Sequence, residues 1–562
     1  MAARTLSMNP NDQDDDFSAE AWVSDAFEWF QCETESQFSS HDPPRLPVDS
    51  VQIVAIGAEL VNALGSPIAW LEAIRNRSHE NSSGVYRRLS LFSRSYSAAL
   101  QQACLDASWD EDVSLIRDTT NVAVDLYLAF HALGLVEGQG FLLQTLAWPR
   151  TEQALSQLVD LMIQFPPADW TASAMALSPL MRNTDWPIKA VFPALLNGLH
   201  NPTMIAPLLD LANFCHHQKM VELHPASEHA DSLTQMLGGI VARLGMLEED
   251  PTKFGEEPLR IQQVLSDAIA VCVSLCDALG LMGCQEAIGK LHQALSLTHR
   301  RVQTEAAGAL ARLNQEFGRE SLVALAAEPV ARLRVLHYAE ELGLSDKIDA
   351  LHSQPCAIAE AELALWLAQP QQLGLPPQNI EVVDQRMLFW PSFDEPQACF
   401  LFRFHYQLPN GKWSNIGMAG PLVHSFAADL ADLPVSDIYA AFAGWHAEHP
   451  EIFEIPVEHW NAAHQRQAAP LMRWLEDNQH ENIRPLWIGC FLNEICLVVE
   501  STVDSATGVA VTDGLETIWY SNVGRIRPPG AFEAYSVFKG RKILRTFNPD
   551  MSIELETGNE PH

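Results

Sequence analysis

The 562-residue sequence lacks the features that mark several common classes of protein. Its 10 cysteines include no CxxC pair and lie mostly in apolar helical stretches, so we expect buried free thiols instead of a disulfide framework. No GxGxxG, Walker or GxSxG motif is present to indicate a phosphate loop or a nucleophile elbow. No run of eighteen apolar residues occurs, and residues 1–20 have no apolar signal-peptide core. The sequence therefore predicts a cytoplasmic protein without a membrane span.

Basic residues are also scarce, since 35 Lys and Arg stand against 71 Asp and Glu and the formal net charge is -36. A field of this sign repels phosphate backbones, so we expect no nucleic-acid partner and favour a protein partner with a basic surface. One stretch reverses the sign, the segment KGRKILR at residues 539–545. Hydrophobic residues flank it, and we expect an amphipathic strand edge there.

Apolar residues at three- and four-residue spacing are abundant from residue 51 to about residue 370, which predicts a long series of helices. Three helix endings, CDALG, LARLN and EELG, fall at similar positions in successive units of residues 267–348. Leu279 and Leu313 are 34 residues apart, and Leu313 and Leu342 are 29 apart. Periods of this size are typical of helical solenoids, in which each unit buries the apolar face of its neighbour.

Within residues 267–348, the helix pair EAAGALARL and GRESLVALAAEP resembles HEAT repeats, including the short HEAT-like form also seen in phycobilin lyases. The resemblance is close over about 80 residues and looser over about 200 more. It implies an α-helical solenoid that presents a binding surface, and its lyase branch implies chromophore handling. It assigns no role to any particular residue.

Composition changes after the break at residues 370–378. The segment QACFLFRFHYQLPNGKWSNIGMAG alternates apolar and polar residues around Asn410-Gly411, which predicts a β-hairpin, and GMAGP is expected to turn towards a helix in LVHSFAADL. Two helices are expected next, in VSDIYAAFAGWHAEHPEIF and VEHWNAAHQRQAAPLMRWLEDNQ. Three later segments, LWIGCFLNEICLVVESTV, GLETIWYS and AYSVFKGRKILRTF, are strand-like. The predicted fold class is mainly α, a HEAT-like solenoid followed by an α+β domain.

This organisation divides the chain into four parts. They are an acidic flexible tail at 1–50, a HEAT-like solenoid at 51–370, an α+β domain with an antiparallel sheet at 380–550, and a C-terminal tail at 551–562. Inside the first part, AEAWVSDAFEWFQ admits two interpretations. It is either a docking peptide that folds on a partner or a helix that packs against the rest of this chain.

The segment GWHAEHPEIFE has the most chemical character. His446 and His449 share a helix face, with Glu448 between them, and Trp413 and Trp445 are further candidates for a binding site. The spacing matches neither HExxH nor its reversed form, so the sequence predicts no metal and no cofactor.

Two functional classes remain open. The first is a scaffold or adaptor that presents an acidic solenoid surface to a macromolecular partner. The alternative is an enzyme or small-ligand protein, bilin-lyase-like in one version, with its pocket at the junction of the solenoid and the C-terminal domain. We favour the scaffold over an enzyme because no triad or ligand spacing supports catalysis.

Overall fold

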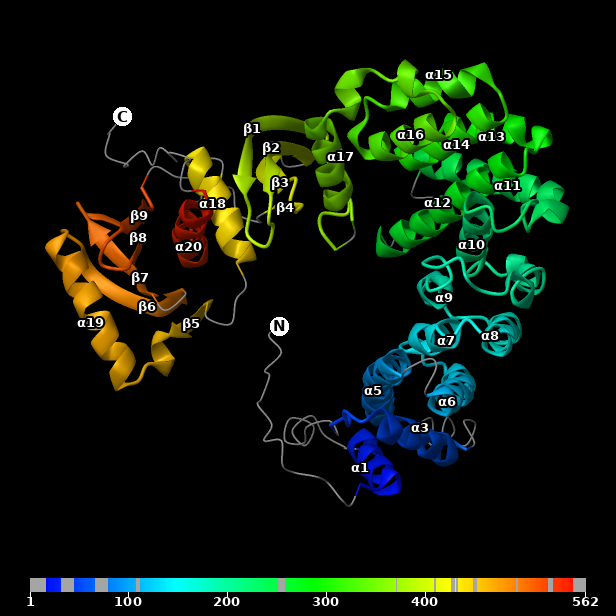
Figure 1. Cartoon of the computed structure of the whole chain (residues 1–562), viewed down its shortest axis with the longest axis horizontal. Helices are drawn as coiled ribbons and strands as arrows, with labels where there is room; N and C mark the ends of the chain where they lie inside the picture. The colour runs from blue at the N-terminus through cyan, green and yellow to red at the C-terminus, as the bar shows by residue number, and fades with distance from the viewer. Residues whose placement is uncertain are drawn as a thin grey trace. The chain divides into compact units, whose positions relative to one another are not determined.

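The computed structural model divides the chain into two compact units, residues 1–321 and 322–562, which are taken in turn (Figure 1). The second unit begins before the change of composition near residue 375. The structure describes residues 17–31, 45–65, 79–107, 112–250, 258–369, 371–408, 411–425, 430, 433–447, 452–491, 494–523 and 529–548. The chain is mostly helical with a C-terminal region of two sheets, so the predicted combination of helices and an α+β region is confirmed.

The first unit is a succession of helices, each packed against the next or the next but one in the chain. Contacts link α5, α7, α9, α10, α12 and α14 in one row, which we call the first row; α11 and α13 pack beside it (Figure 1). The bounds are α1 (Ala19–Gln31), α3 (Ser50–Leu64), α5 (His79–Asp106), α6 (Val113–Leu133), α7 (Gln139–Ala147), α8 (Glu152–Gln164), α9 (Trp170–Leu177), η1 (Ile188–Ala190), η2 (Ala194–His200), α10 (Ile205–His217), η3 (Ser227–His229), α11 (Ala230–Glu249), α12 (Pro258–Leu281), η5 (Gln285–Ala287), α13 (Ile288–Leu295), α14 (Arg300–Arg312) and α15 (Glu316–Leu325).

Local sequence sets the ends of these helices. The Thr151 hydroxyl accepts a hydrogen bond from the backbone N–H of Ala154 at the start of α8, and Asp169 does the same for Ala172 in α9. Gly134 ends α6 with φ of 69°, a left-handed conformation that glycine adopts without steric cost. The sharp ends allow short connections, so consecutive helices pack face to face.

Helix α1 lies inside the segment for which the sequence predicts an acidic tail. Its aromatic face is packed, because Phe30 is fully buried and Trp22 lies 5.8 Å from Phe92 in α5, measured between ring centroids. The Arg88 side chain donates a hydrogen bond to the Phe30 carbonyl at 3.3 Å. Of the two interpretations of this segment, the structure supports the helix that packs on the chain itself.

One helix in the described part of the chain has the length and apolar character to cross a membrane, residues Ile261–Leu281 of α12. More than half of this window is buried against other helices of the first unit. A buried core helix passes the same test, so the finding is weak evidence for a membrane span.

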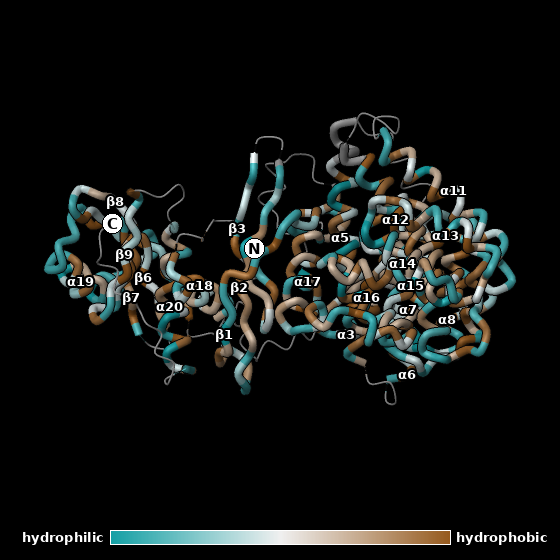
Figure 2. Tube along the Cα trace, turned by 90° about the horizontal axis from the view of Figure 1, so that it is seen from above, coloured by the Kyte–Doolittle hydropathy of each residue, from teal (hydrophilic) through white to brown (hydrophobic). Residues whose placement is uncertain are grey.

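The division after residue 321 falls inside α15, so the second unit contains the last residues of that helix, followed by α16 (Pro329–Glu341) and α17 (Pro355–Leu367). It continues into a four-stranded antiparallel sheet. Arg332 is almost fully buried and joins the two helices, because it donates hydrogen bonds to Glu360 and to the Ala357 carbonyl. The strands, in the order β1-β2-β3-β4, are β1 (Asn379–Phe389), β2 (Pro396–Leu408), β3 (Gly411–Ala419) and β4 (His424–Ser425). Leu408 pairs with Gly411, which confirms the predicted hairpin. Its arms are hydrophilic near the turn and hydrophobic further along (Figure 2).

A second antiparallel sheet follows, in the order β5-β6-β7-β8-β9. Its strands and the helices around it are α18 (Val435–His446), β5 (Ile452–Pro456), η8 (Val457–His459), α19 (Ala462–Asp477), β6 (Glu481–Phe491), β7 (Glu494–Val503), β8 (Ala506–Thr512), β9 (Thr517–Ser521) and α20 (Ala531–Phe547). Helix α19 packs on β6 and β7, while α18 and α20 pack against each other. One core joins α18, α20 and residues of both sheets.

Three predictions for this region are wrong. The segment containing KGRKILR is not a strand but the helix α20. Residues 534–540 of this helix are all buried, so its sequence does not show the polar face that would distinguish a helix from a strand. Residues 424–425 pair with β3 as β4, where a helix was expected. Residues 452–456 form β5 instead of extending α18. The predicted tail at 551–562 lies outside the described residues.

Candidate functional site

Two of the residues that the sequence singles out come together around a third that it missed. Trp445 and His446 are the last two residues of α18, and their rings lie 4.6 Å and 4.9 Å from the ring of His424 in β4. Trp413 belongs to a different cluster, because it packs on Tyr406 at 5.7 Å on the side of the sheet that α17 covers. Glu448 and His449 lie outside the described residues.

The His424 imidazole is held in a neutral state. Burial, with a smaller contribution from the neighbouring His446, lowers its pKa to about 4. His424 was hard to identify from the sequence, because β4 is only two residues long and has no strand pattern of its own. Among the described residues, no three or more His, Cys, Asp or Glu side chains are placed to hold a metal ion. The group thus supplies aromatic packing and a neutral imidazole.

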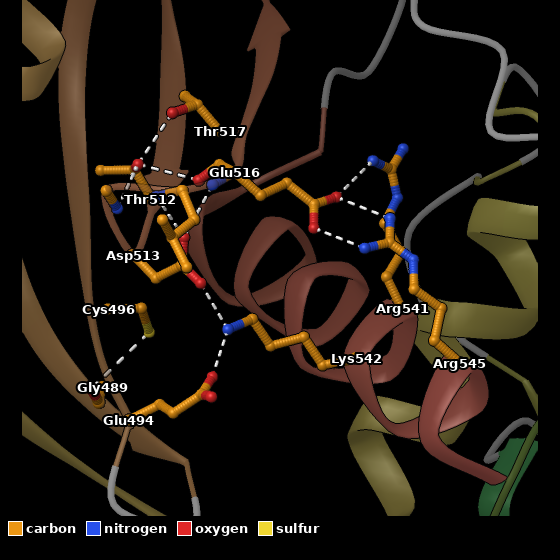
Figure 3. Close-up of polar contacts among 12 residues, drawn as sticks. Gly489, Glu494, Cys496, Thr512, Asp513, Glu516, Thr517, Arg541, Lys542 and Arg545 are labelled. Carbon is orange, nitrogen blue, oxygen red and sulfur yellow. Dashed lines mark hydrogen bonds and ion pairs between the residues drawn. The ribbon is translucent and has the colours of Figure 1, made fainter. Parts of the chain in front are cut away.

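The basic stretch in α20 is the second place with dense polar contacts (Figure 3). Arg541 donates to both carboxylate oxygens of Asp437 at 2.8 and 2.9 Å, and Arg545 donates to both oxygens of Glu516 at 2.8 and 3.0 Å. The Lys542 ammonium contacts Asp513 in the second sheet. The chain's own carboxylates neutralise these cations, so the stretch attaches α20 to the second sheet and to α18.

Asp513 shows how strong this attachment is. Burial alone would raise the pKa of its carboxyl group, but hydrogen bonds from Lys542 and from the backbone N–H groups of Glu516 and Leu515 outweigh burial and lower the pKa. The group therefore remains ionised in the folded protein. Its role is to hold the β8–β9 turn against α20.

The third group of polar residues lies in the first row of the first unit, between α10 and α12. The Ser274 hydroxyl donates to Asp210 at 2.6 Å, and the Asn213 amide donates to the Ser274 carbonyl at 3.2 Å. One turn further along, His217 Nε2 lies 3.3 Å from a carboxylate oxygen of Asp277. These contacts form a polar seam between two helices that are otherwise apolar where they meet, and we call it the α10–α12 seam.

Helix α14 extends this seam. Arg312 donates to the second carboxylate oxygen of Asp277 at 2.6 Å, and both side chains are mostly buried. Near the start of α14, Arg301 in the first turn and Glu305 one turn later interact electrostatically with Asp210. Three successive helices of the first row therefore share one network of charges.

Asp210 is an exposed member of the network, as is Arg301, whereas Asp277 and Glu305 are buried. Although water reaches it, protein atoms surround it closely enough that loss of hydration raises the pKa of the carboxyl group to about 6. The Ser274 hydrogen bond and the charge of Arg301 oppose this rise, while Asp277 and Glu305 add to it. A solvent-accessible carboxyl group whose pKa is raised in this way is a candidate for a functional site.

Histidines border the seam. His224 is buried, and burial, with a smaller contribution from His216, lowers its pKa to about 4. Its Nδ1 accepts from the backbone N–H of Ala226, so Nε2 carries the proton and donates to the side-chain amide oxygen of Asn213 at 2.9 Å. This neutral histidine fixes the orientation of Asn213, which in turn donates to α12.

Comparisons with known proteins add no assignment, because no family model, no curated protein and no solved structure matches this chain. The sequence did not point to the seam, since Asp210 and Ser274 are 64 residues apart. A signal was present in the polar Ser274 and Asp277, which interrupt the apolar run of α12. Chemically, the seam can accept a cation at Asp210 without any metal or cofactor.

Proposed function

We propose that this protein is a scaffold whose first unit is a HEAT-like α-helical solenoid that binds a basic segment of a protein partner. Packing of the helices in chain order supports the solenoid, together with the period of 34 and 29 residues between equivalent leucines. The net charge of -36 supports a basic partner, because the field of the chain attracts cations and repels phosphates.

The observation that carries the proposal is the exposed carboxylate of Asp210 on the first row. Its ionised form is disfavoured by burial and by Asp277 and Glu305. A lysine or arginine of a partner placed beside it would stabilise the ionised carboxylate. Binding would therefore offset the unfavourable energy of this charge in the free protein.

The test is a pull-down with the full-length protein over a series of salt concentrations. We expect a partner whose recovery falls as salt rises, because the attraction of exposed charges is screened. Asp210→Asn should reduce recovery at low salt. Asp160→Asn, a change at an exposed carboxylate of α8, is the matched control and should leave recovery unchanged. If both variants recover the wild-type amount, or if no partner is retained at any salt, the proposal is wrong.

A further inference from the structure

The Ser274 hydroxyl in the α10–α12 seam has one hydrogen and two acceptors. Its oxygen lies 2.6 Å from a carboxylate oxygen of Asp210 and 3.0 Å from the carbonyl oxygen of Ala270, one turn earlier in α12. While Asp210 is ionised, the Ser274 hydroxyl donates its hydrogen to the carboxylate and cannot also donate it to the Ala270 carbonyl. One of two available hydrogen bonds is then unmade.

A proton on Asp210 resolves this conflict. The protonated carboxyl can donate to the Ser274 oxygen, and the Ser274 hydroxyl is then free to donate to the Ala270 carbonyl. The same three groups therefore make one hydrogen bond in the ionised state and two in the protonated state, with no movement of heavy atoms. The geometry therefore accommodates both protonation states, and the single charge-assisted bond to the carboxylate is stronger than either bond of the neutral carboxyl.

We infer that Asp210 is a reversible proton-binding switch in the folded protein, and that a cationic side chain of the partner competes with the proton for this carboxylate. The inference deepens the proposed function and rests on it for the partner, while the proton switch itself concerns the free protein. Protonation closes the relay from Asp210 through Ser274 to Ala270 and removes the negative charge. Binding of the cation requires the relay to be open.

The charged groups around Asp210 agree with this assignment. Helix α12 brings Ser274 and Asp277 to it, and α14 brings Arg301 and Glu305. The other segments packed on α10 add little, because α9 has no titratable residue and η2 has only His200. Burial, with the two carboxylates, outweighs Arg301 and Ser274, and raises the pKa of Asp210 to about 6. The switch therefore operates in mildly acidic solution.

The first experiment uses the free protein and needs no partner. Thermal unfolding of the wild type and of Asp210→Asn is measured from pH 8 to pH 4.5. The folded state binds the Asp210 proton more tightly than the unfolded chain does, so the melting temperature of the wild type should rise relative to the variant as pH falls through about 6. Parallel melting curves at every pH would overturn the switch.

Ser274→Ala separates a proton relay from a merely structural contact. Without its hydroxyl the carboxylate loses a donor, so the midpoint of the pH dependence should move to higher pH. A Ser274 that only packed between the helices, without bonding the carboxylate, would lower the melting temperature and leave the midpoint in place. Ser296→Ala, which removes a hydroxyl that bonds the His292 carbonyl in the same i to i−4 manner, is the control and should leave the midpoint in place.

The second experiment measures competition by the cation, with a tetralysine peptide as the probe. At pH 7.5 Asp210 is nearly all ionised and at pH 5.5 about a quarter is, so the affinity of the wild type should fall about fourfold between these values. Asp210→Asn should bind weakly at both. If the melting curves show the switch but the peptide binds equally at both pH values, the proton switch stands and the cation site at Asp210 is wrong.

Discussion

The side-chain amide of Asn548 hydrogen-bonds both backbone polar groups of Phe389, although the two residues are 159 positions apart. The Phe389 N–H donates to the amide oxygen at 2.7 Å, and the amide nitrogen donates to the Phe389 carbonyl at 3.1 Å. Phe389 ends β1, which is an edge strand of the first sheet. Asn548 thus takes the place of a neighbouring strand at this point and attaches the end of α20 to the sheet.

Asn548→Ala should destabilise the second unit by about 1–3 kcal/mol, because the part-buried hydrogen bonds between the buried Asn548 amide and the backbone of Phe389 are lost. Urea unfolding followed by tryptophan fluorescence measures the effect. The control is Asn478→Ala, since the Asn478 amide also bonds a backbone carbonyl but is exposed. A control loss as large as that of Asn548→Ala would show that the buried position is not the cause.

Arg541 and Asp437 form the most buried of the ion pairs that fix α20. Asp437 also accepts a hydrogen bond from the Tyr520 hydroxyl at 3.2 Å. Arg541→Met leaves the carboxylate buried without its main partner, so we expect a loss of about 3–5 kcal/mol in the free energy of unfolding. Arg545→Met removes a more exposed cation and should cost about 1 kcal/mol or less.

A double-mutant cycle tests the assignment of this energy to the pair. Arg541→Met combined with Asp437→Leu should be less destabilised than the sum of the two single changes, because the buried charge disappears with its partner. Strict additivity in urea unfolding would contradict the role of the pair in fixing α20.

The sequence predicted those elements whose pattern is local. The hairpin at Gly411 follows from a turn dipeptide between two alternating segments, and the helices of the first unit follow from their apolar spacing. Helix α20 was predicted as a strand because residues 534–547 are rich in β-branched and aromatic residues and because hydrophobic residues flank the basic stretch. Residues 534–540 are all buried, so the helix lacks the exposed polar face that would distinguish the 3.6-residue period of a helix from the 2-residue period of a strand.

The candidate site was beyond sequence reasoning for another reason. The pKa of the Asp210 carboxyl is unusual because burial raises it, and because Asp277 and Glu305, which come from two other helices, add to the rise against the opposing Ser274 hydrogen bond. No pattern of spacing in the sequence predicts that these residues lie close together. His446 was predicted from its neighbours in the chain, whereas its contact with His424 depends on the pairing of β4 with β3.

Two glycines allow α18 and α20 to approach closely. A Cβ atom on Gly540 would lie 1.7 Å from the Ala440 carbonyl oxygen, and one on Gly444 would lie 1.9 Å from the Ser536 carbonyl oxygen. Backbone atoms cannot yield as side chains do, so Gly540→Ala should separate the helices and cost about 3 kcal/mol. Thermal unfolding measures the loss.

The matched control for this change is Gly239→Ala in α11, where a Cβ would meet no atom within 4 Å. Alanine has the higher helix propensity, so this variant should be more stable than the wild type by up to about 1 kcal/mol. Opposite signs for the two glycine changes are expected. A Gly540→Ala variant as stable as the wild type would mean that α18 and α20 do not cross so closely.

His224 provides a pH dependence opposite in sign to that of Asp210. Burial lowers the pKa of this histidine from its ordinary value of 6.5 to about 4, so the unfolded chain binds its proton more readily than the folded protein does. Stability is therefore complete above pH 6.5 and is lost as pH falls towards 4, by about 3 kcal/mol in all. The loss should weaken the contact that His224 makes with Asn213 and hence the α10–α12 seam.

Urea unfolding of the wild type and of His224→Gln at pH 7 and pH 4.5 measures this contribution. At pH 7 the variant should be about 1–2 kcal/mol less stable, because the buried hydrogen bonds to Asn213 and from Ala226 are disturbed. At pH 4.5 the order should reverse and the variant should be the more stable, because glutamine takes up no proton and the wild type has lost more than its advantage at pH 7. His229→Gln, at an exposed residue of η3, should follow the wild type at both pH values. An undiminished gap at pH 4.5 would mean that His224 protonates as readily in the folded protein as in the unfolded chain.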